Sequence, residues 1–301
     1  MPTTKKTLFQ GVATALITPF KEGTLDLEAY KKLLHFQKEN GVTALVIAGT
    51  TGESPTLNER ERVTLLEIAR DELGNTLPLI MGTGANDTEK VLQMSREAQR
   101  HGADGLLIVT PYYNKGTKNG IISHYLTVAE AVDLPICLYN VPSRTGVDLS
   151  LDILEKLAEH ENIVALKEAN GSIDRVAETV AYLGDALTVY SGNDSQILPI
   201  LSLGGKGVIS VVSNLYPTLT ADLCHAYFSR NNETARAIQL RLLPIIKLLF
   251  KETNPAPIKA AMEIAAMCEN QLRLPLAPVS ENLYSELRYE MDRLEKASFN
   301  Q

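Results

Sequence analysis

The sequence predicts an α/β protein, a (β/α)8 barrel or TIM barrel, with a helical extension at its C-terminus. Its 301 residues fit one such barrel of about 250 residues together with a further segment. Eight short apolar segments alternate with longer amphipathic segments along residues 1–232. The short segments are continuously apolar, which is typical of parallel strands that are buried on both faces.

The eight predicted strands are residues 12–17, 44–47, 79–82, 105–109, 136–140, 164–168, 187–191 and 207–211. Helices are predicted between them where apolar side chains recur at helical spacing, including residues 26–39, 58–73, 87–101, 121–132 and 151–159. The number of strands favours a closed barrel. The alternative, an open doubly wound sheet, is disfavoured because no GxGxxG motif follows the first strand.

The predicted strands stop before residue 233, which divides the chain into a catalytic barrel, residues 1–232, and a C-terminal helical region, residues 233–301. Helices are expected in that region at residues 234–250, 257–268 and 279–297, with Pro244 interrupting the first. The region either contacts another subunit or caps its own barrel, and the sequence leaves both alternatives open.

Composition argues against several classes of partner. The net charge of −7, the lack of Trp and the lack of a basic stripe argue against nucleic acid. No run approaches the roughly 18 apolar residues that a membrane span requires. The apolar stretch after Lys5 and Lys6 is short, and we interpret it as the first strand rather than a signal peptide. Three scattered cysteines without a CxxC pair predict a reducing, cytoplasmic compartment.

Lys167 is the first candidate catalytic residue, because active sites of such barrels lie at the C-terminal ends of the strands. It stands near the end of the sixth predicted strand, where alternation places Ala165, Lys167 and Ala169 on one face. If this face lines the interior, the amine loses water and becomes neutral more readily. A neutral amine can attack a carbonyl carbon and form a Schiff base. The alternative is a structural ion pair, for example with Glu168.

Polar residues at neighbouring strand ends complete a candidate site. Tyr139 lies on the fifth strand, next to the strand of Lys167, and its hydroxyl can both donate and accept a proton. Thr50 and Thr51, in a glycine-flanked turn after the second strand, can extend a proton relay. Arg144, on the loop after Tyr139, can bind a carboxylate through two parallel hydrogen bonds.

These residues also allow structural interpretations. Tyr139 can be a core residue, the threonine turn can be only a turn, and Arg144 can form a surface salt bridge. Glu53, in the same turn, either positions backbone amides or acts as a general acid or base. Three other kinds of site are disfavoured. The five histidines fall in predicted helices rather than clustering as the ligands of a zinc aldolase. The sequence contains no P-loop motif for nucleotide binding and no GxSxG motif of a hydrolase.

Several motifs closely resemble those of the dihydrodipicolinate synthase family: GTTGES at 49–54, PYYN at 111–114, YNVPSRTG at 139–146, LKEA around Lys167, GVISV at 207–211 and ETNPAPIK at 252–259. The resemblance covers essentially the whole chain. This family belongs with N-acetylneuraminate lyase in a superfamily of pyruvate-dependent class I aldolases. The resemblance implies a cytoplasmic lyase, a homotetramer built as a dimer of dimers, and no metal or organic cofactor.

The resemblance also implies the reaction and the roles of individual residues. Pyruvate, bound as a lysine Schiff base, condenses with L-aspartate 4-semialdehyde to 4-hydroxy-tetrahydrodipicolinate, a step of lysine and diaminopimelate biosynthesis. Catalytic roles are implied for Lys167, Tyr139, Thr50 and Tyr113, the last donated by a neighbouring subunit. Substrate-binding roles are implied for Thr51, Arg144, Gly192 and Ile209.

Arg144 favours the synthase over its relatives. The matching loop of sialic-acid lyases resembles YNIPxLSG and lacks this arginine, as suits a sugar that brings hydroxyl groups rather than a nearby carboxylate. Two alternatives stay open: a Schiff-base aldolase acting on a 2-keto-sugar acid, and a catalytically silent barrel that binds a keto acid.

A candidate effector pocket departs from the pattern of lysine-inhibited members. Ser54, Asn86 and Tyr112 match that pocket, whereas Pro55, Glu59, Arg62 and Lys90 do not. Lys90 stands where a carboxylate would meet the ammonium group of the effector. Because like charges repel, the sequence predicts weak or absent inhibition by lysine.

Overall fold

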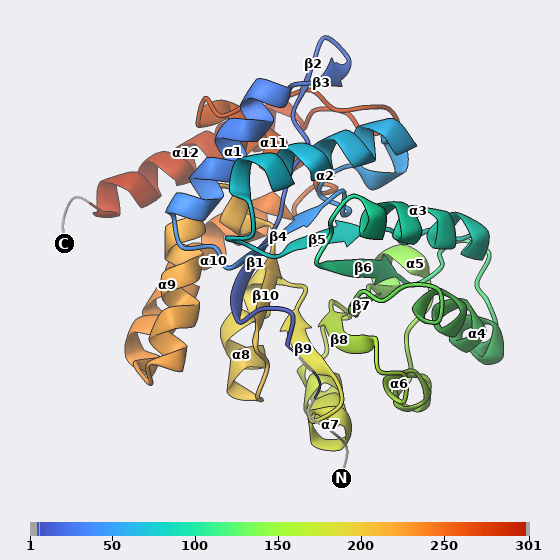
Figure 1. Ribbon diagram of the computed structural model, residues 1–301. Helices are drawn as coiled ribbons and strands as arrows, with labels where there is room; N and C mark the ends of the chain where they lie inside the picture. The colour runs from blue at the N-terminus through green and yellow to red at the C-terminus, as the bar shows by residue number, and fades with distance from the viewer. Residues whose placement is uncertain (1–4, 6, 299–301) are drawn as a thin grey trace.

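Eight parallel strands close into a barrel in the computed structural model, which describes residues 5 and 7–298 (Figure 1). The strands are β1 (Gly11–Ala15), β4 (Ala44–Ile47), β5 (Leu79–Gly82), β6 (Gly105–Val109), β7 (Ile136–Asn140), β8 (Ile163–Glu168), β9 (Thr188–Ser191) and β10 (Gly207–Ser210). Each pairs with its sequence neighbour in the barrel, and β1 closes the ring by pairing with both β4 and β10. The predicted (β/α)8 barrel is therefore confirmed.

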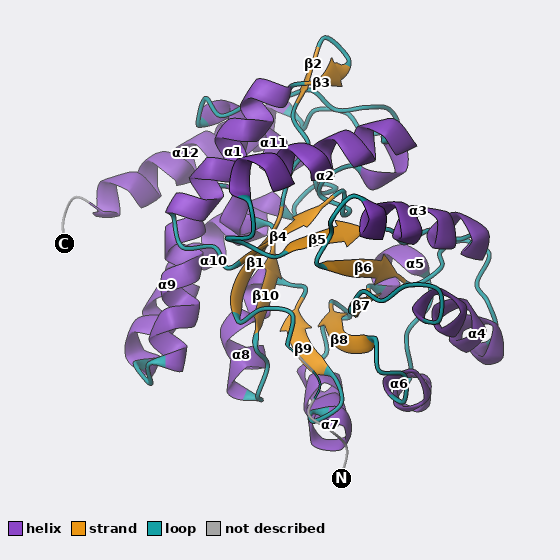
Figure 2. Cartoon of the chain, in the orientation of Figure 1, coloured by secondary structure: helices purple, strands orange, loops and turns teal. Residues whose placement is uncertain are grey.

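Helices surround the strands on the outside of the barrel (Figure 2). They are α1 (Leu27–Glu39), α2 (Glu59–Leu73), α3 (Thr88–Arg100), α4 (Lys118–Ala129), α5 (Pro142–Thr145), α6 (Leu151–Ala158), α7 (Ile173–Leu183), α8 (Ile197–Ser202) and α9 (Pro217–Phe228). Short 3-10 helices are η1 (Ser54–Thr56), η2 (Asp194–Gln196) and η3 (Val212–Asn214). Asn58 begins α2 with a capping box, in which it exchanges hydrogen bonds with Glu61.

The barrel interior is filled by a cluster of buried side chains of mixed size. Ala13, Ala15 and Ala165 belong to this interior cluster. Phe9 and Tyr190 stack at a centroid distance of 4.1 Å in the same cluster, and the Tyr190 hydroxyl donates to the Phe9 carbonyl oxygen at 2.7 Å. Larger aliphatic residues form a second, outer layer between strands and helices. The interior is thus packed with side chains below the strand ends.

Three further helices form the C-terminal region: α10 (Asn232–Leu249), α11 (Ala256–Ile264) and α12 (Glu281–Ser298). They pack against α9 and against one another, and their apolar residues join the outer core of the barrel. The region thus covers its own barrel; a contact with another subunit and the proposed domain division both stay predictions. No helix among the described residues is long and apolar enough to cross a membrane.

Apart from shifts of a few residues at helix ends, the structure differs from the sequence prediction in two details. Pro244 does not interrupt α10, which continues through it because a proline removes only one backbone hydrogen bond and α10 is held by α9 and α12. A hairpin of β2 (Phe20–Lys21) and β3 (Thr24–Leu25) follows β1 and was not predicted. Its strands are too short for any periodicity to be recognised.

Candidate active site

Lys167 lies near the end of β8 and points into the barrel. Its side chain is only 6% exposed, and its Nζ atom lies 4.0 Å from the centroid of the Tyr139 ring. The two residues are partners in the parallel register of β7 and β8, which explains the contact. The predicted proximity of the amine to the tyrosine is therefore present in the structure.

The alternative interpretation of Lys167, an ion pair with Glu168, is not what the structure shows. Consecutive residues of a strand point to opposite faces, and the Glu168 carboxylate instead accepts hydrogen bonds from Asn140 Nδ2 at 3.0 and 3.1 Å. The Asn170 backbone amide donates to it at 2.8 Å. Burial raises the pKa of the Glu168 carboxyl, and these hydrogen bonds oppose that rise.

A cavity of about 170 Å³ opens beside Lys167 at the ends of the strands. Six predicted site residues line it together: Thr50, Thr51, Tyr139, Arg144, Lys167 and Gly192. Tyr139 and Lys167 lie near the ends of β7 and β8, and the other four lie on the loops after β4, β7 and β9, as a barrel active site requires. Ile209, also predicted to bind substrate, is not in the wall of this cavity; it lies on β10 and is buried in the barrel interior with Tyr139 and Ala165.

Gly192 lets the loop after β9 approach β8 closely. A Cβ atom there would lie 2.7 Å from Ala169 Cβ and 3.0 Å from the Glu168 carbonyl oxygen, so any side chain would force the two strand ends apart. Its own backbone amide donates to that same oxygen at 2.7 Å. The glycine therefore keeps the backbone at the cavity wall beside Lys167.

Glu53 is not a cavity residue. Its Oε1 atom pairs with Lys259 Nζ at 2.5 Å, both side chains being fully buried, and its Oε2 atom accepts from the Arg273 backbone amide at 3.0 Å. Of the two roles predicted for Glu53, the structure shows the positioning of a backbone amide. Burial lowers the pKa of Lys259, while Glu53 raises it. The pair fastens the turn of Thr50 and Thr51 to the C-terminal region.

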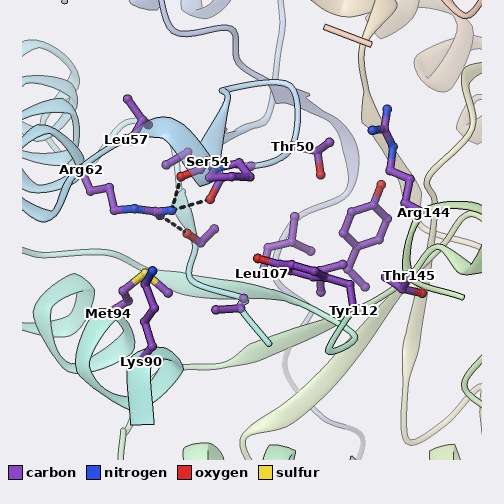
Figure 3. Close-up of a pocket in the computed structure, with 18 of the residues that line it drawn as sticks. Thr50, Ser54, Leu57, Arg62, Lys90, Met94, Leu107, Tyr112, Arg144 and Thr145 are labelled. Atoms are coloured by element: carbon purple, nitrogen blue, oxygen red, sulfur yellow. Dashed lines mark hydrogen bonds between the residues drawn. The ribbon is translucent and has the colours of Figure 1, made fainter. Parts of the chain in front are cut away.

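A second cavity, of about 410 Å³, continues from the first because both share Thr50, Tyr139 and Arg144 as walls. It extends between α2 and α3, where Ser54, Lys90 and Tyr112 line it (Figure 3). The fourth residue of the predicted effector pocket, Asn86, is not in its wall; the Asn86 carbonyl oxygen accepts from Asn114 Nδ2 at 2.8 Å.

Arg62 adds a second cation to this larger cavity. Its guanidinium donates to the Ser54 hydroxyl and carbonyl oxygens at 2.5 and 2.6 Å and to the Gly82 carbonyl oxygen at 2.9 Å (Figure 3). Burial lowers the pKa of Arg62, but an arginine stays charged in proteins. Lys90, on α3, also lines this cavity and lies below Arg62 in the view of Figure 3.

Tyr113 is the one predicted catalytic residue that a single chain does not bring to the site. It is 89% exposed, has a positive φ of 74°, and lines neither cavity. Its neighbour Tyr112 does line the larger cavity. A contribution of Tyr113 to catalysis therefore requires that another copy of the chain receive it.

Two cavity residues from the C-terminal region were missed by the sequence analysis. Phe250 and Asn254 line the smaller cavity together with Lys167. Asn254 Nδ2 donates to Thr51 Oγ1 at 3.0 Å, and its carbonyl oxygen accepts from Arg144 Nη2 at 3.1 Å. The motif ETNPAPIK contains Asn254 and was the one sequence feature that pointed to it. The motif does not indicate that Asn254 contacts Thr51 and Arg144.

A buried lysine at the end of a barrel strand, with a tyrosine hydroxyl, threonine hydroxyls and an arginine around one small cavity, defines the class of Schiff-base aldolases. These groups can form an imine with a keto acid, move its protons and bind carboxylates. No group of three or more His, Cys, Asp or Glu side chains suited to a metal ion is found among the described residues.

The chain belongs to the dihydrodipicolinate synthetase family, whose model matches residues 8–294. It is 48% identical over 285 residues to 4-hydroxy-tetrahydrodipicolinate synthase of Thermotoga neapolitana, covering 93% of this chain and 97% of that protein. The same enzyme of Clostridium novyi is 43% identical over 292 residues, covering 97% and 99%. The solved dihydrodipicolinate synthase of Thermotoga maritima superposes with a TM-score of 0.94 at 46% identity, covering 96% of this chain and 99% of that one.

Proposed function

We propose that the protein condenses pyruvate, held as a Schiff base on Lys167, with L-aspartate 4-semialdehyde to give 4-hydroxy-tetrahydrodipicolinate. The observation that carries this proposal is the Lys167 amine, 4.0 Å from the Tyr139 ring in a cavity that Thr50, Thr51 and Arg144 also line. Relatives that bear the name of this activity match most of the chain. The step belongs to lysine and diaminopimelate biosynthesis.

The reaction begins when the Lys167 amine attacks the keto carbon of pyruvate. The carbinolamine loses water to form an imine, and loss of a methyl proton gives an enamine. The enamine carbon attacks the aldehyde carbon, whose oxygen takes up a proton. The amino group of the product then attacks the imine carbon, closing the ring and releasing the Lys167 amine. Tyr139 and Thr50 carry the protons between these groups.

The two carboxylates of the substrates require separate binding groups. The Thr51 hydroxyl, with backbone groups of Gly192 and Ile209, binds pyruvate beside Lys167. Arg144 is exposed at the rim of both cavities, which suits binding of the carboxylate of the incoming aldehyde. The arrangement holds pyruvate deep in the barrel and admits the aldehyde after it.

We further propose a cytoplasmic homotetramer in which Tyr113 of one subunit completes the proton relay of its neighbour. The exposure of Tyr113, next to a tyrosine that lines the larger cavity, supports this role. Solved relatives include a monomeric dihydrodipicolinate synthase variant, so the fold alone does not fix the assembly. If the protein sedimented as a monomer and the same preparation were fully active, the role of Tyr113 would be contradicted.

An assay with pyruvate and L-aspartate 4-semialdehyde, coupled to consumption of the product, tests the proposed reaction. We expect turnover with this pair and much slower turnover when a sugar aldehyde replaces the semialdehyde, because Arg144 then has no carboxylate to bind. Cleavage of a 2-keto-sugar acid without turnover of aspartate semialdehyde would favour the aldolase alternative. A lack of any turnover would favour a silent keto-acid-binding barrel.

The candidate effector pocket of Ser54, Asn86, Tyr112 and Lys90 should bind L-lysine weakly. Arg62 and Lys90 both bring a positive charge to this cavity, and like charges repel, so they disfavour the ammonium groups of L-lysine. We expect millimolar L-lysine to leave the rate nearly unchanged. The matched variant Lys90→Glu should be inhibited at lower lysine concentrations than the native enzyme. Half-inhibition of the native enzyme at micromolar lysine would contradict this prediction.

A further inference from the structure

Asn254 lies between α10 and α11, 5% exposed, in the wall of the cavity that holds Lys167. Its side chain donates from Nδ2 to Thr51 Oγ1 at 3.0 Å, and its backbone carbonyl oxygen accepts from Arg144 Nη2 at 3.1 Å. One residue of the C-terminal region therefore contacts both residues to which the proposed function gives carboxylate binding.

The contact with Thr51 has a direction that matters for an anion. A threonine hydroxyl has one hydrogen to donate and two lone pairs to accept with. The amide hydrogen of Asn254 occupies one lone pair of Thr51 Oγ1. The single hydroxyl hydrogen stays available for another acceptor in the cavity, such as a carboxylate oxygen.

The Asn254 side chain is not the only contact between this segment and the turn of Thr51. The buried ion pair of Lys259 with Glu53 joins the start of α11 to the same turn. Within the described residues, the buried Oδ1 atom of Asn254 has no hydrogen-bond partner. An asparagine that served only as a structural fastener would be expected to satisfy both ends of its amide.

We propose that Asn254 is a positioning residue that orients the Thr51 hydroxyl so that its hydrogen points to the carboxylate of pyruvate. This inference rests on the proposed function, because it assumes that pyruvate is the keto acid bound at Lys167. It assigns a role in substrate binding to a segment more than a hundred residues from the strand ends it serves.

Borohydride trapping of the pyruvate imine, measured by mass spectrometry over a range of pyruvate concentrations, tests the proposal without the aldehyde. In Asn254→Asp the side chain can no longer donate and instead competes for the Thr51 hydrogen. We expect half-maximal labelling at a pyruvate concentration raised roughly tenfold or more, and a smaller rise for Asn254→Ala. If Asn254 had only a packing role, Asn254→Ala would raise the half-labelling concentration more than Asn254→Asp, because Asp has the shape of Asn.

The Thr51→Val variant, which lacks the hydroxyl, is the second member of a double-mutant cycle with Asn254→Ala. If Asn254 acts through the Thr51 hydroxyl, Asn254→Ala should raise the half-labelling concentration in the native enzyme but have almost no further effect in Thr51→Val. In the full assay, the KM for pyruvate should rise in Asn254→Ala while the KM for the aldehyde changes little, because the backbone contact with Arg144 remains. Thermal unfolding identifies any variant that does not fold, and Asn254→Ser then replaces it.

The outcomes separate the two hypotheses. Absence of a pyruvate adduct in the native enzyme would overturn the proposed function itself. A native adduct combined with unchanged half-labelling in Asn254→Asp, or with additive effects of the Asn254 and Thr51 substitutions, would overturn the positioning role alone.

Discussion

Replacement of Lys167 by alanine should abolish both turnover and pyruvate trapping. Among the described residues, Lys167 is the only lysine that lines the smaller cavity, and the buried Lys259 is paired with Glu53 outside it. Without a covalent imine the enamine cannot form at neutral pH, so we expect a loss of about 10³-fold or more in kcat. The fold should persist, because a lysine with no ion pair at the cavity contributes little to stability.

The measurement combines the coupled assay with borohydride trapping and mass spectrometry. Lys206→Ala is the matched control, because Lys206 is exposed and immediately precedes β10, at the opposite end of the barrel from the site. This control should keep native turnover and labelling. A pyruvate adduct that persisted in Lys167→Ala would show that a different amine carries the chemistry.

The fold was predictable because each strand is a continuous apolar run that parallel packing buries on both faces. The strand at residues 44–47, for example, is found at Ala44–Ile47 with all four residues buried. The hairpin of β2 and β3 was not predictable, because two-residue strands carry no period. The continuity of α10 through Pro244 depends on tertiary packing, which outweighs the local preference.

The site was predictable where it depends on strand register. Alternation along β8 and the adjacency of β7 place Lys167 next to Tyr139, and both follow from sequence order in a parallel barrel. Asn254 was not predictable in this way, since it lies 203 residues from Thr51 and 110 residues from Arg144 along the chain. The role of Glu53 was not predictable for the same reason. Its buried partner Lys259 comes from the C-terminal region, which the sequence of the turn does not indicate.

These contacts explain why the C-terminal region matters for a site formed by barrel loops. Asn254 contacts Thr51, and Lys259 contacts Glu53 two residues further along the same turn. Breaking a buried ion pair by removing one partner typically costs about 3–5 kcal/mol, because a charge is left uncompensated. The turn that presents Thr50 and Thr51 is therefore held from outside the barrel as well as by its own strand.

Arg144→Ala should leave pyruvate trapping intact and strongly weaken use of aspartate semialdehyde. Arg144 lies at the shared rim of the two cavities, away from the imine, so the first half of the reaction does not require it. A bidentate arginine–carboxylate contact is among the strong hydrogen-bonded pairs in proteins, and we expect kcat/KM for the aldehyde to fall about 10²-fold or more.

The measurement specific to this role compares aldehydes that have a carboxylate with aldehydes that lack one. An aldehyde without a carboxylate should be used equally poorly by the native enzyme and by Arg144→Ala, whereas aspartate semialdehyde should distinguish them. Arg96→Ala, at an exposed position on α3, controls for loss of a positive charge in general. Full turnover of aspartate semialdehyde by Arg144→Ala would mean that another group binds this carboxylate. A parallel loss of trapping would instead place Arg144 in pyruvate binding, because its contact with the Asn254 carbonyl oxygen links it to the residue that touches Thr51.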